Sequence, residues 1–185
     1  MGEHCGLLAH AASLVGDPQV RHRGTIGGAV SHGDPASDLP TVLLALDADF
    51  VVTGPEGERT IAASGFFRGI FATALGPQDV LTGIRVPRAS GTYVKFNRRA
   101  QDWATVGVAV ACVNGDVRVG LTSMGATPLR AVGVEEALAG GAGPAAAAER
   151  ADEGTSPVSD LAGSADYRRH LARVLVRRAL ETVGR

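Results

Sequence analysis

The stretch RHRGTIGGAVSHGDPASDLP, Arg21 to Pro40, contains four glycines and two prolines and few large apolar side chains. Glycine has no Cβ, so the backbone can turn sharply and come close to a ligand, and successive N–H groups can surround a phosphate. Gly27 and Gly28, beside the hydroxyl of Thr25, are therefore suited to a pyrophosphate. Asp38 could accept hydrogen bonds from a ribityl or ribose hydroxyl.

Two simpler interpretations of this stretch stay open at the level of residues. The glycine pair can make an ordinary loop, and Asp38 can cap the helix that follows. The stretch has no Gly-Lys-Ser/Thr ending and lacks the glycine spacing of a dinucleotide fingerprint after a strand. His32 and Asp34 have no third ligand nearby, so no metal site is expected. Ser31 beside His32 gives no nucleophile site, because adjacent side chains do not converge.

Composition restricts the classes of protein that this chain can represent. Of its 185 residues 45% are hydrophobic and 20% are charged, which is typical of a folded chain. The net charge of -1 gives no general attraction to nucleic acid or anionic lipid. Cys5 and Cys112 are too few for a disulfide framework, which favours the cytoplasm. The apolar run Thr105–Val113 is well short of the ~20 residues that cross a bilayer, so no membrane insertion is expected.

The first half of the sequence predicts helices and a hairpin. Apolar spacing predicts a helix over His4–Val15, and a second helix over Pro40–Asp47 with Ser37 or Asp38 as its cap. The β-rich runs Asp49–Thr53 and Arg59–Ile61 flank a Gly-Pro turn and predict a hairpin. Val80–Val86 predicts a further strand, which Pro87 ends.

The second half predicts an antiparallel sheet with helices packed on it. We place a boundary between residues 88 and 89, giving units 1–88 and 89–185. Tyr93–Phe96, Thr105–Val113 and Val117–Met124 are expected as three strands, the last two joined by an Asn-Gly turn. Gly133–Ala139 is expected as a short helix. Gly140–Ser156 is expected as a loose connection, although its four consecutive alanines are compatible with a helix.

The end of the sequence predicts a long amphipathic helix. Tyr167, Leu171, Leu175, Ala179 and Val183 recur every four residues and predict one buried stripe. The arginines around that stripe are expected on a solvated or subunit-facing surface rather than at a nucleic-acid interface, because the chain has no excess of basic residues.

Several motifs together resemble the FAD-binding medium subunit of the molybdenum hydroxylases, the family of carbon monoxide dehydrogenase and xanthine dehydrogenase. The motifs, in chain order, are Arg21–Gly28, Asp34–Pro40, Leu43–Ala48, Phe66–Phe67, Val80–Pro87, Lys95–Ala104, Pro128–Ala131 and Tyr167–Leu171. They extend through nearly the whole chain, and their order and spacing carry the resemblance.

The resemblance implies an α/β plus α+β fold. It consists of the C-terminal portion of an FAD-binding domain of the PCMH/vanillyl-alcohol-oxidase type, followed by a three-stranded antiparallel sheet with packed helices. Residues 25–28, Thr25-Ile26-Gly27-Gly28, would hold the FAD pyrophosphate, and Asp38 would contact its sugar-alcohol portion. Lys95 and Trp103 would lie near the isoalloxazine, although Trp103 could instead anchor the interface between the two units.

The implied role is electron transfer without a catalytic residue or a metal ligand in this chain. A molybdenum-cofactor large subunit and a [2Fe–2S] small subunit would be the partners in a hetero-oligomer, and FAD would pass electrons to an external acceptor. Two departures stand against this role. The family's first glycine-rich loop has no counterpart here, and Ala29 replaces a polar residue. The alternative is a truncated structural or assembly remnant that binds no flavin.

Overall fold

The computed structural model describes residues 5–184, so His4 of the expected first helix lies outside the described residues. The helices are α1 Gly6–Ser13, α2 Pro18–Arg23, α3 Ile26–His32, α4 Asp38–Ala45, α5 Val132–Ala139, α6 Pro144–Ala148 and α7 Ala165–Thr182, with a 3-10 turn at Ala63–Gly65. The strands are β1 Asp49–Gly54, β2 Gly57–Ala62, β3 Phe67–Gly69, β4 Ala72–Thr73, β5 Val80–Arg85, β6 Ser90–Phe96, β7 Val106–Val113, β8 Asp116–Thr122 and β9 Leu129–Arg130. Among these helices, none combines the length and the hydropathy that are needed to span a bilayer.

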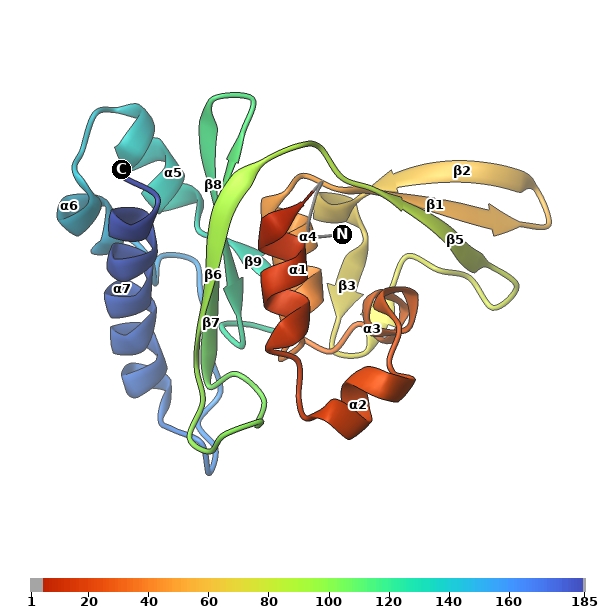
Figure 1. Cartoon of the computed structure of the whole chain (residues 1–185), viewed down its shortest axis with the longest axis horizontal. Coiled ribbons are helices and arrows are strands. Elements are labelled where there is room, and N and C mark those ends of the chain that lie inside the picture. The colour runs from red at the N-terminus through yellow and green to blue at the C-terminus, as the bar shows by residue number, and fades with distance from the viewer. Residues whose placement is uncertain (1–4, 185) are drawn as a thin grey trace.

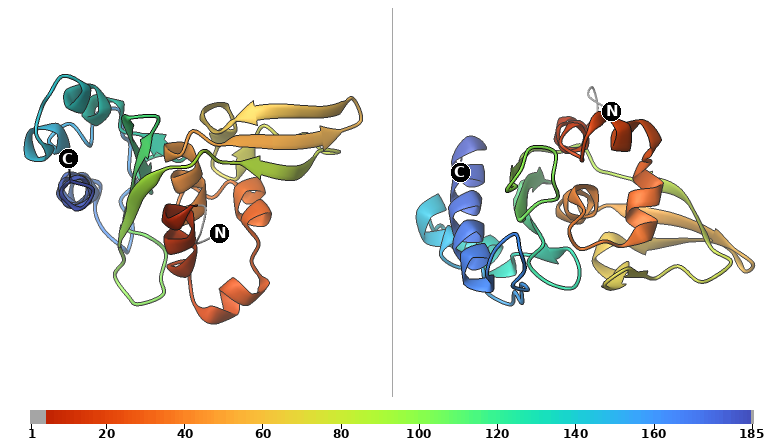
Figure 2. Two further views of the ribbon diagram at one scale, coloured as in Figure 1. Left: turned by 45° about the horizontal axis from the view of Figure 1, so that its top comes forward. Right: turned by 90° about the horizontal axis from the view of Figure 1, so that it is seen from below.

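The antiparallel sheet β6-β7-β8-β9 lies between two hydrophobic cores. Helices α1 and α4 pack on one face of this sheet and α7 packs on the other (Figure 1). The left view of Figure 2 looks nearly along α7 and shows the sheet between α7 and α1. Alternate residues of β7 point to opposite faces, so Ala109 and Ala111 belong to the first core, whereas Val108 and Val110 belong to the second. A strand covered on both faces explains the unbroken apolar run in this part of the sequence.

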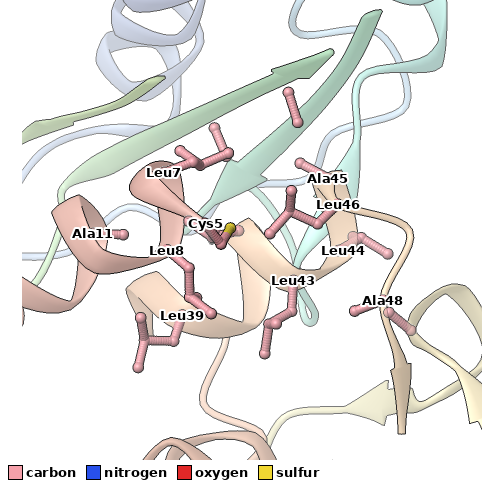
Figure 3. Close-up of a cluster of buried hydrophobic side chains, with 14 of the residues drawn as sticks. Cys5, Leu7, Leu8, Ala11, Leu39, Leu43, Leu44, Ala45, Leu46 and Ala48 are labelled. Carbon is pink, nitrogen blue, oxygen red and sulfur yellow. The ribbon is translucent and has the colours of Figure 1, made fainter. Parts of the chain in front are cut away.

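Small residues let α4 lie close to this sheet. A Cβ added to Gly120 of β8 would come within 2.7 Å of the carbonyl oxygen of Thr41 on α4. Leu39, Leu43 and Leu46 of the α4 segment then interlock with Leu7 and its neighbours on α1 (Figure 3). The close approach brings the start of α4, and with it Asp38, next to β6.

A second sheet has the order β2-β1-β5. Phe50 and Val52 of β1 are fully buried, and Phe50 packs edge-on against Phe66 with 4.5 Å between ring centroids. The β1–β2 hairpin turns at Gly57, whose φ of +102° favours glycine. Its outer strand β2 is largely exposed.

Most of the predicted elements are present. The β1–β2 hairpin, β5 and the three long strands of the central sheet lie where the sequence placed them, and Asn114-Gly115 makes the β7–β8 turn with positive φ at both residues. The two-residue strand β9 extends that sheet. Helix α4 begins at Asp38 rather than Pro40, and the side chain of Ser37 makes no capping hydrogen bond.

Part of the glycine-rich stretch is helical: α2 ends within it and α3 lies wholly inside it. Asp17 caps α2 by accepting from Val20 N at 2.9 Å, and Pro18 occupies the first turn. Thr25 caps α3 in the same way, and Gly33 ends it in the left-handed conformation. The glycine pair therefore lies in a helix and not in an ordinary loop, and the sequence did not reveal either helix because both caps are made by residues that also favour turns.

The C-terminal region corrects two further expectations. Residues 144–148 form α6, and Ala147, Ala148 and Ala151 are fully buried in the second core, so this connection is packed rather than loose. In α7 the stripe of leucines and alanines is buried as expected, but Tyr167 is 41% exposed. Arg168 is buried instead, because its guanidinium pairs with Asp160 at 2.7 Å.

Candidate functional site

A cavity of about 800 Å³ lies beside the glycine-rich segment. Its lining comes from one side of α1, from α2, from residues 24–26 and 28–29, from His32 and Asp34 at the end of α3, from the start of α4 and from Trp103. Most of the lining is apolar side chain and glycine backbone, with a few polar groups. Proteins commonly use cavities of this size and composition to bind cofactors and other small molecules.

The glycine-rich segment offers bare backbone to this cavity. Thr25 is the N-cap of α3, and its Oγ1 accepts a hydrogen bond from Gly28 N at 3.0 Å. The N–H groups of Ile26 and Gly27 lie in the first helical turn, where the helix supplies no acceptor. A Cβ added to Gly27 would meet nothing within 4 Å, whereas one added to Gly28 would lie 3.0 Å from Thr25 Oγ1. Open space next to these donors leaves room for an oxygen-rich group.

Trp103 also belongs to the lining. It lies on the connection between β6 and β7, where its backbone N–H donates to Asp102 Oδ1 at 2.9 Å. The residue is 68% exposed, so it is not buried between the two cores. The indole is therefore available to stack on a flat ring in the cavity.

Asp38 and Lys95 form a buried ion pair rather than part of the lining. Lys95 Nζ donates to Asp38 Oδ2 at 2.9 Å and to the carbonyl oxygen of Leu14 at 3.1 Å. Each charged side chain is only 6% exposed. The pair joins β6 to the start of α4 and to the end of α1. Its neighbours Ser37 and Leu39 reach the cavity, whereas Asp38, Lys95 and Gly27 are absent from its lining.

Tyr93 completes this buried cluster, and the sequence did not single it out. Its hydroxyl donates to Asp38 Oδ1 at 2.6 Å and lies 3.4 Å from Thr122 Oγ1. Burial raises the pKa of Asp38, while the hydrogen bond from Tyr93 and the charge of Lys95 oppose the rise. Burial next to Asp38 also raises the pKa of Tyr93 well above its usual value, so the phenol stays protonated and donates. One signal in the sequence could have revealed Tyr93. It lies two residues before Lys95, and this spacing puts both side chains on one face of a strand.

A second polar cluster joins the two cores at the other end of α4. Asp47, at the end of the helix, accepts from Arg118 of β8 at 3.0 Å and from Arg130 of β9 at 2.5 Å. Arg130 also pairs with Glu135 at 2.6 Å. Two of the motifs that carried the family resemblance, Leu43–Ala48 and Pro128–Ala131, thus meet here and join the two cores rather than lining the cavity.

The two residues considered for a metal site have other roles. The ring of His32 packs on Phe71 with 4.8 Å between centroids. Asp34 Oδ1 accepts from Ala36 N at 2.8 Å. Across residues 5–184 no three His, Cys, Asp or Glu side chains converge in a way that could hold a metal ion.

Both halves of the chain match known families. Residues 1–89 match the FAD binding domain in molybdopterin dehydrogenase, and residues 91–183 match the CO dehydrogenase flavoprotein C-terminal domain. Among curated proteins, the carbon monoxide dehydrogenase medium chain of Hydrogenophaga pseudoflava is 44% identical over 94% of this chain. The glyceraldehyde dehydrogenase medium chain of Sulfolobus acidocaldarius is 37% identical over 96% of this chain and is covered over 68% of its own length.

Solved structures show the same fold. A chain of carbon monoxide dehydrogenase from Hydrogenophaga pseudoflava superposes with a TM-score of 0.90 over 95% of this chain. A chain of quinoline 2-oxidoreductase from Pseudomonas putida 86, 27% identical, superposes with a TM-score of 0.88 over 98% of this chain and 67% of its own. The sequence spans 65% of the length of the Hydrogenophaga medium chain. On this evidence, the chain belongs to the family of FAD-binding medium subunits of the molybdenum hydroxylases.

Proposed function

We propose that this chain holds FAD in the cavity beside residues 24–29 and acts as the electron-transfer unit of a molybdenum-dependent hydroxylase or dehydrogenase. The observation that carries the proposal is the joint placement of the bare glycine backbone and the exposed Trp103 in the lining of one cavity. The glycine backbone suits a pyrophosphate, and the indole of Trp103 suits a flat aromatic ring.

The residues of the site fit the parts of FAD. Thr25, Ile26, Gly27 and Gly28 would hold the pyrophosphate through backbone N–H groups, and the hydroxyl of Thr25 keeps its own proton free to donate while it caps α3. Gly28 borders the cavity directly, and the space beside Gly27 is open, because a Cβ added there would touch nothing, although Gly27 itself is not in the lining. Trp103 would stack on the isoalloxazine.

The buried pair Asp38–Lys95 also keeps capacity for a ligand. An ammonium has three N–H donors, and Lys95 uses two of them within the described residues. Each oxygen of the Asp38 carboxylate can accept a second hydrogen bond beyond those from Tyr93 and Lys95. We therefore propose Asp38 as a contact of the sugar-alcohol chain and Lys95 as a contact near the flavin ring.

FAD supplies one-electron and two-electron redox chemistry when it is bound. The role of this chain is then to orient the ring, to exclude water with the apolar side of the cavity, and to set the polarity around it. We propose a hetero-oligomer with a molybdenum-cofactor large subunit and a [2Fe–2S] small subunit, since its relatives are named medium chains. Electrons would pass from the clusters to an external acceptor, and the cytoplasmic location stays a prediction.

Flavin content tests this function. The chain is expressed alone and together with candidate large and small subunits, and bound flavin is measured by its absorbance and by its release on denaturation. We expect stoichiometric FAD in the assembled complex. A complex that assembles without flavin would contradict electron transfer and support the structural alternative.

A further inference from the structure

The cavity wall carries two arginines whose surroundings differ. Arg21 and Arg23 both lie in the last turn of α2 and both line the cavity. Arg21 Nη1 donates to the carbonyl oxygens of Val15 and Gly16, each at 2.9 Å, so its guanidinium holds the turn between α1 and α2. Arg23 is exposed, and within residues 5–184 it makes no side-chain hydrogen bond and no ion pair.

The remaining ionisable groups of the lining do not neutralise Arg23. Asp34 is the acidic residue of the lining, and one of its carboxylate oxygens accepts from Ala36 N at 2.8 Å. His32 packs on Phe71. Among the described residues, the guanidinium of Arg23, two residues before Thr25, therefore has no hydrogen-bond or ion-pair partner at the cavity wall. An arginine forms short, charge-assisted and often bidentate hydrogen bonds with phosphate oxygens.

We infer that Arg23 is the anion-binding side chain of this cavity and pairs with the diphosphate of the bound dinucleotide. The inference rests on the proposed function, because it takes FAD as the ligand. Two consequences follow from a charge pairing at an exposed position. Flavin affinity falls as salt rises, because mobile ions screen the pair. The chain also prefers FAD over riboflavin, which has the ring but no phosphate.

The test compares Arg23→Gln with the wild-type chain and with Arg178→Gln, which removes another exposed arginine, from α7. Dissociation constants for FAD and for riboflavin are measured by fluorescence titration of the full chain at low and high KCl. Melting curves verify that each variant folds. We expect Arg23→Gln to weaken FAD binding at low salt by about tenfold, the loss of one charged hydrogen bond. In Arg23→Gln we also expect FAD affinity to depend less on salt and riboflavin affinity to stay unchanged. Arg178→Gln should have the wild-type affinities at both salt concentrations.

Other results overturn the inference in distinguishable ways. Wild-type FAD affinity and salt dependence in Arg23→Gln would refute the pairing while the proposed function stands. Equal losses for FAD and riboflavin would assign Arg23 to the shape of the wall instead of the phosphate. A folded wild-type chain that binds neither flavin, alone or in the assembled complex, would refute the proposed function itself, and this inference with it. Arg23→Lys keeps the charge and is expected to retain the salt dependence with intermediate affinity.

Discussion

In β7, seven of the eight residues are buried, whereas in residues 21–29 of the cavity wall none is. The strand lies between two cores and has almost every atom in contact with protein. The wall presents exposed backbone, including Gly24 and Gly28, and lies beside first-turn N–H groups for which the helix supplies no acceptor. Substitutions in the sheet and its interface should therefore change stability, and substitutions in the wall should change ligand binding.

The largest effect is expected at the buried ion pair between these regions. Lys95→Met leaves the Asp38 carboxylate buried next to Tyr93 without its cation. Breaking such a pair from one side costs about 3–5 kcal/mol of unfolding free energy, which urea denaturation measures. The double variant Asp38→Leu/Lys95→Met removes both charges and should recover much of the loss. A single variant as stable as the wild type would show that the pair does not hold the units together.

The same variant should also change how stability depends on pH. The pKa of Asp38 is already raised in the folded state, and Lys95 lowers it. Without Lys95 the pKa of Asp38 rises further, so the folded variant keeps its proton to higher pH than the unfolded chain does. Its deficit relative to the wild type should be smallest in acid and grow as pH rises through the folded pKa of Asp38. A deficit that does not depend on pH, measured by melting across that range, would contradict the pairing.

The same substitution, glycine to alanine, should have different effects on stability in the two regions. Gly120→Ala pushes a Cβ to within 2.7 Å of Thr41 O and should cost about 1–3 kcal/mol, as overpacking of a core does. Gly27→Ala meets nothing within 4 Å and lies in a helix, so stability should hold or rise by up to about 1 kcal/mol. FAD affinity should fall in Gly27→Ala. Equal destabilisation by both variants would remove the distinction between the regions.

A gain of binding is expected at the residue after the glycine pair. Ala29→Asn adds an amide donor beside Gly28 in the lining of the cavity. One added hydrogen bond to a charged group should raise FAD affinity by about tenfold. Fluorescence titration measures the change, and Ala29→Val, which adds bulk without a donor, is the control. If the control gains as much as Ala29→Asn, the added hydrogen bond is not the cause.

The smallest effect is expected far from both regions, at the Arg59–Asp79 pair. The hydrogen bond from Arg59 lowers the pKa of Asp79 to about 2 in the folded state. The pair therefore stabilises the fold above the ordinary aspartate range and stops doing so as pH falls to about 2. Arg59→Gln should be slightly less stable than the wild type at neutral pH, and melting curves of the two should converge in acid. A difference that persists at acid pH would contradict this assignment.

The sequence predicted the sheet well and the cavity wall less well, for a physical reason. The spacing of apolar residues and the Asn114-Gly115 turn are local features of the sequence. They were enough to predict the buried strands of the central sheet. Helices α2 and α3 were missed because their caps, Asp17 and Thr25, are residues that also make turns, and glycines weaken the helical pattern.

Long-range partners are a second limit on what the sequence shows. Asp38 and Tyr93 are 55 positions apart, and no local pattern announces that their side chains meet. The burial of Arg168 likewise depends on Asp160, in an irregular segment whose path the sequence did not reveal. The family resemblance pointed to Asp38 and Lys95 as cofactor contacts, but their mutual ion pair emerged only from the folded chain.

The most direct test of the account is an FAD titration of the wild-type chain and Gly28→Asp, each with a melting curve. The aspartate brings a Cβ into contact with Thr25 Oγ1 and a negative charge beside the phosphate site. We predict that the wild-type chain binds FAD and that Gly28→Asp, although folded, does not. A folded Gly28→Asp variant that binds FAD as tightly as the wild type would contradict the assignment of the glycine-rich wall to the cofactor.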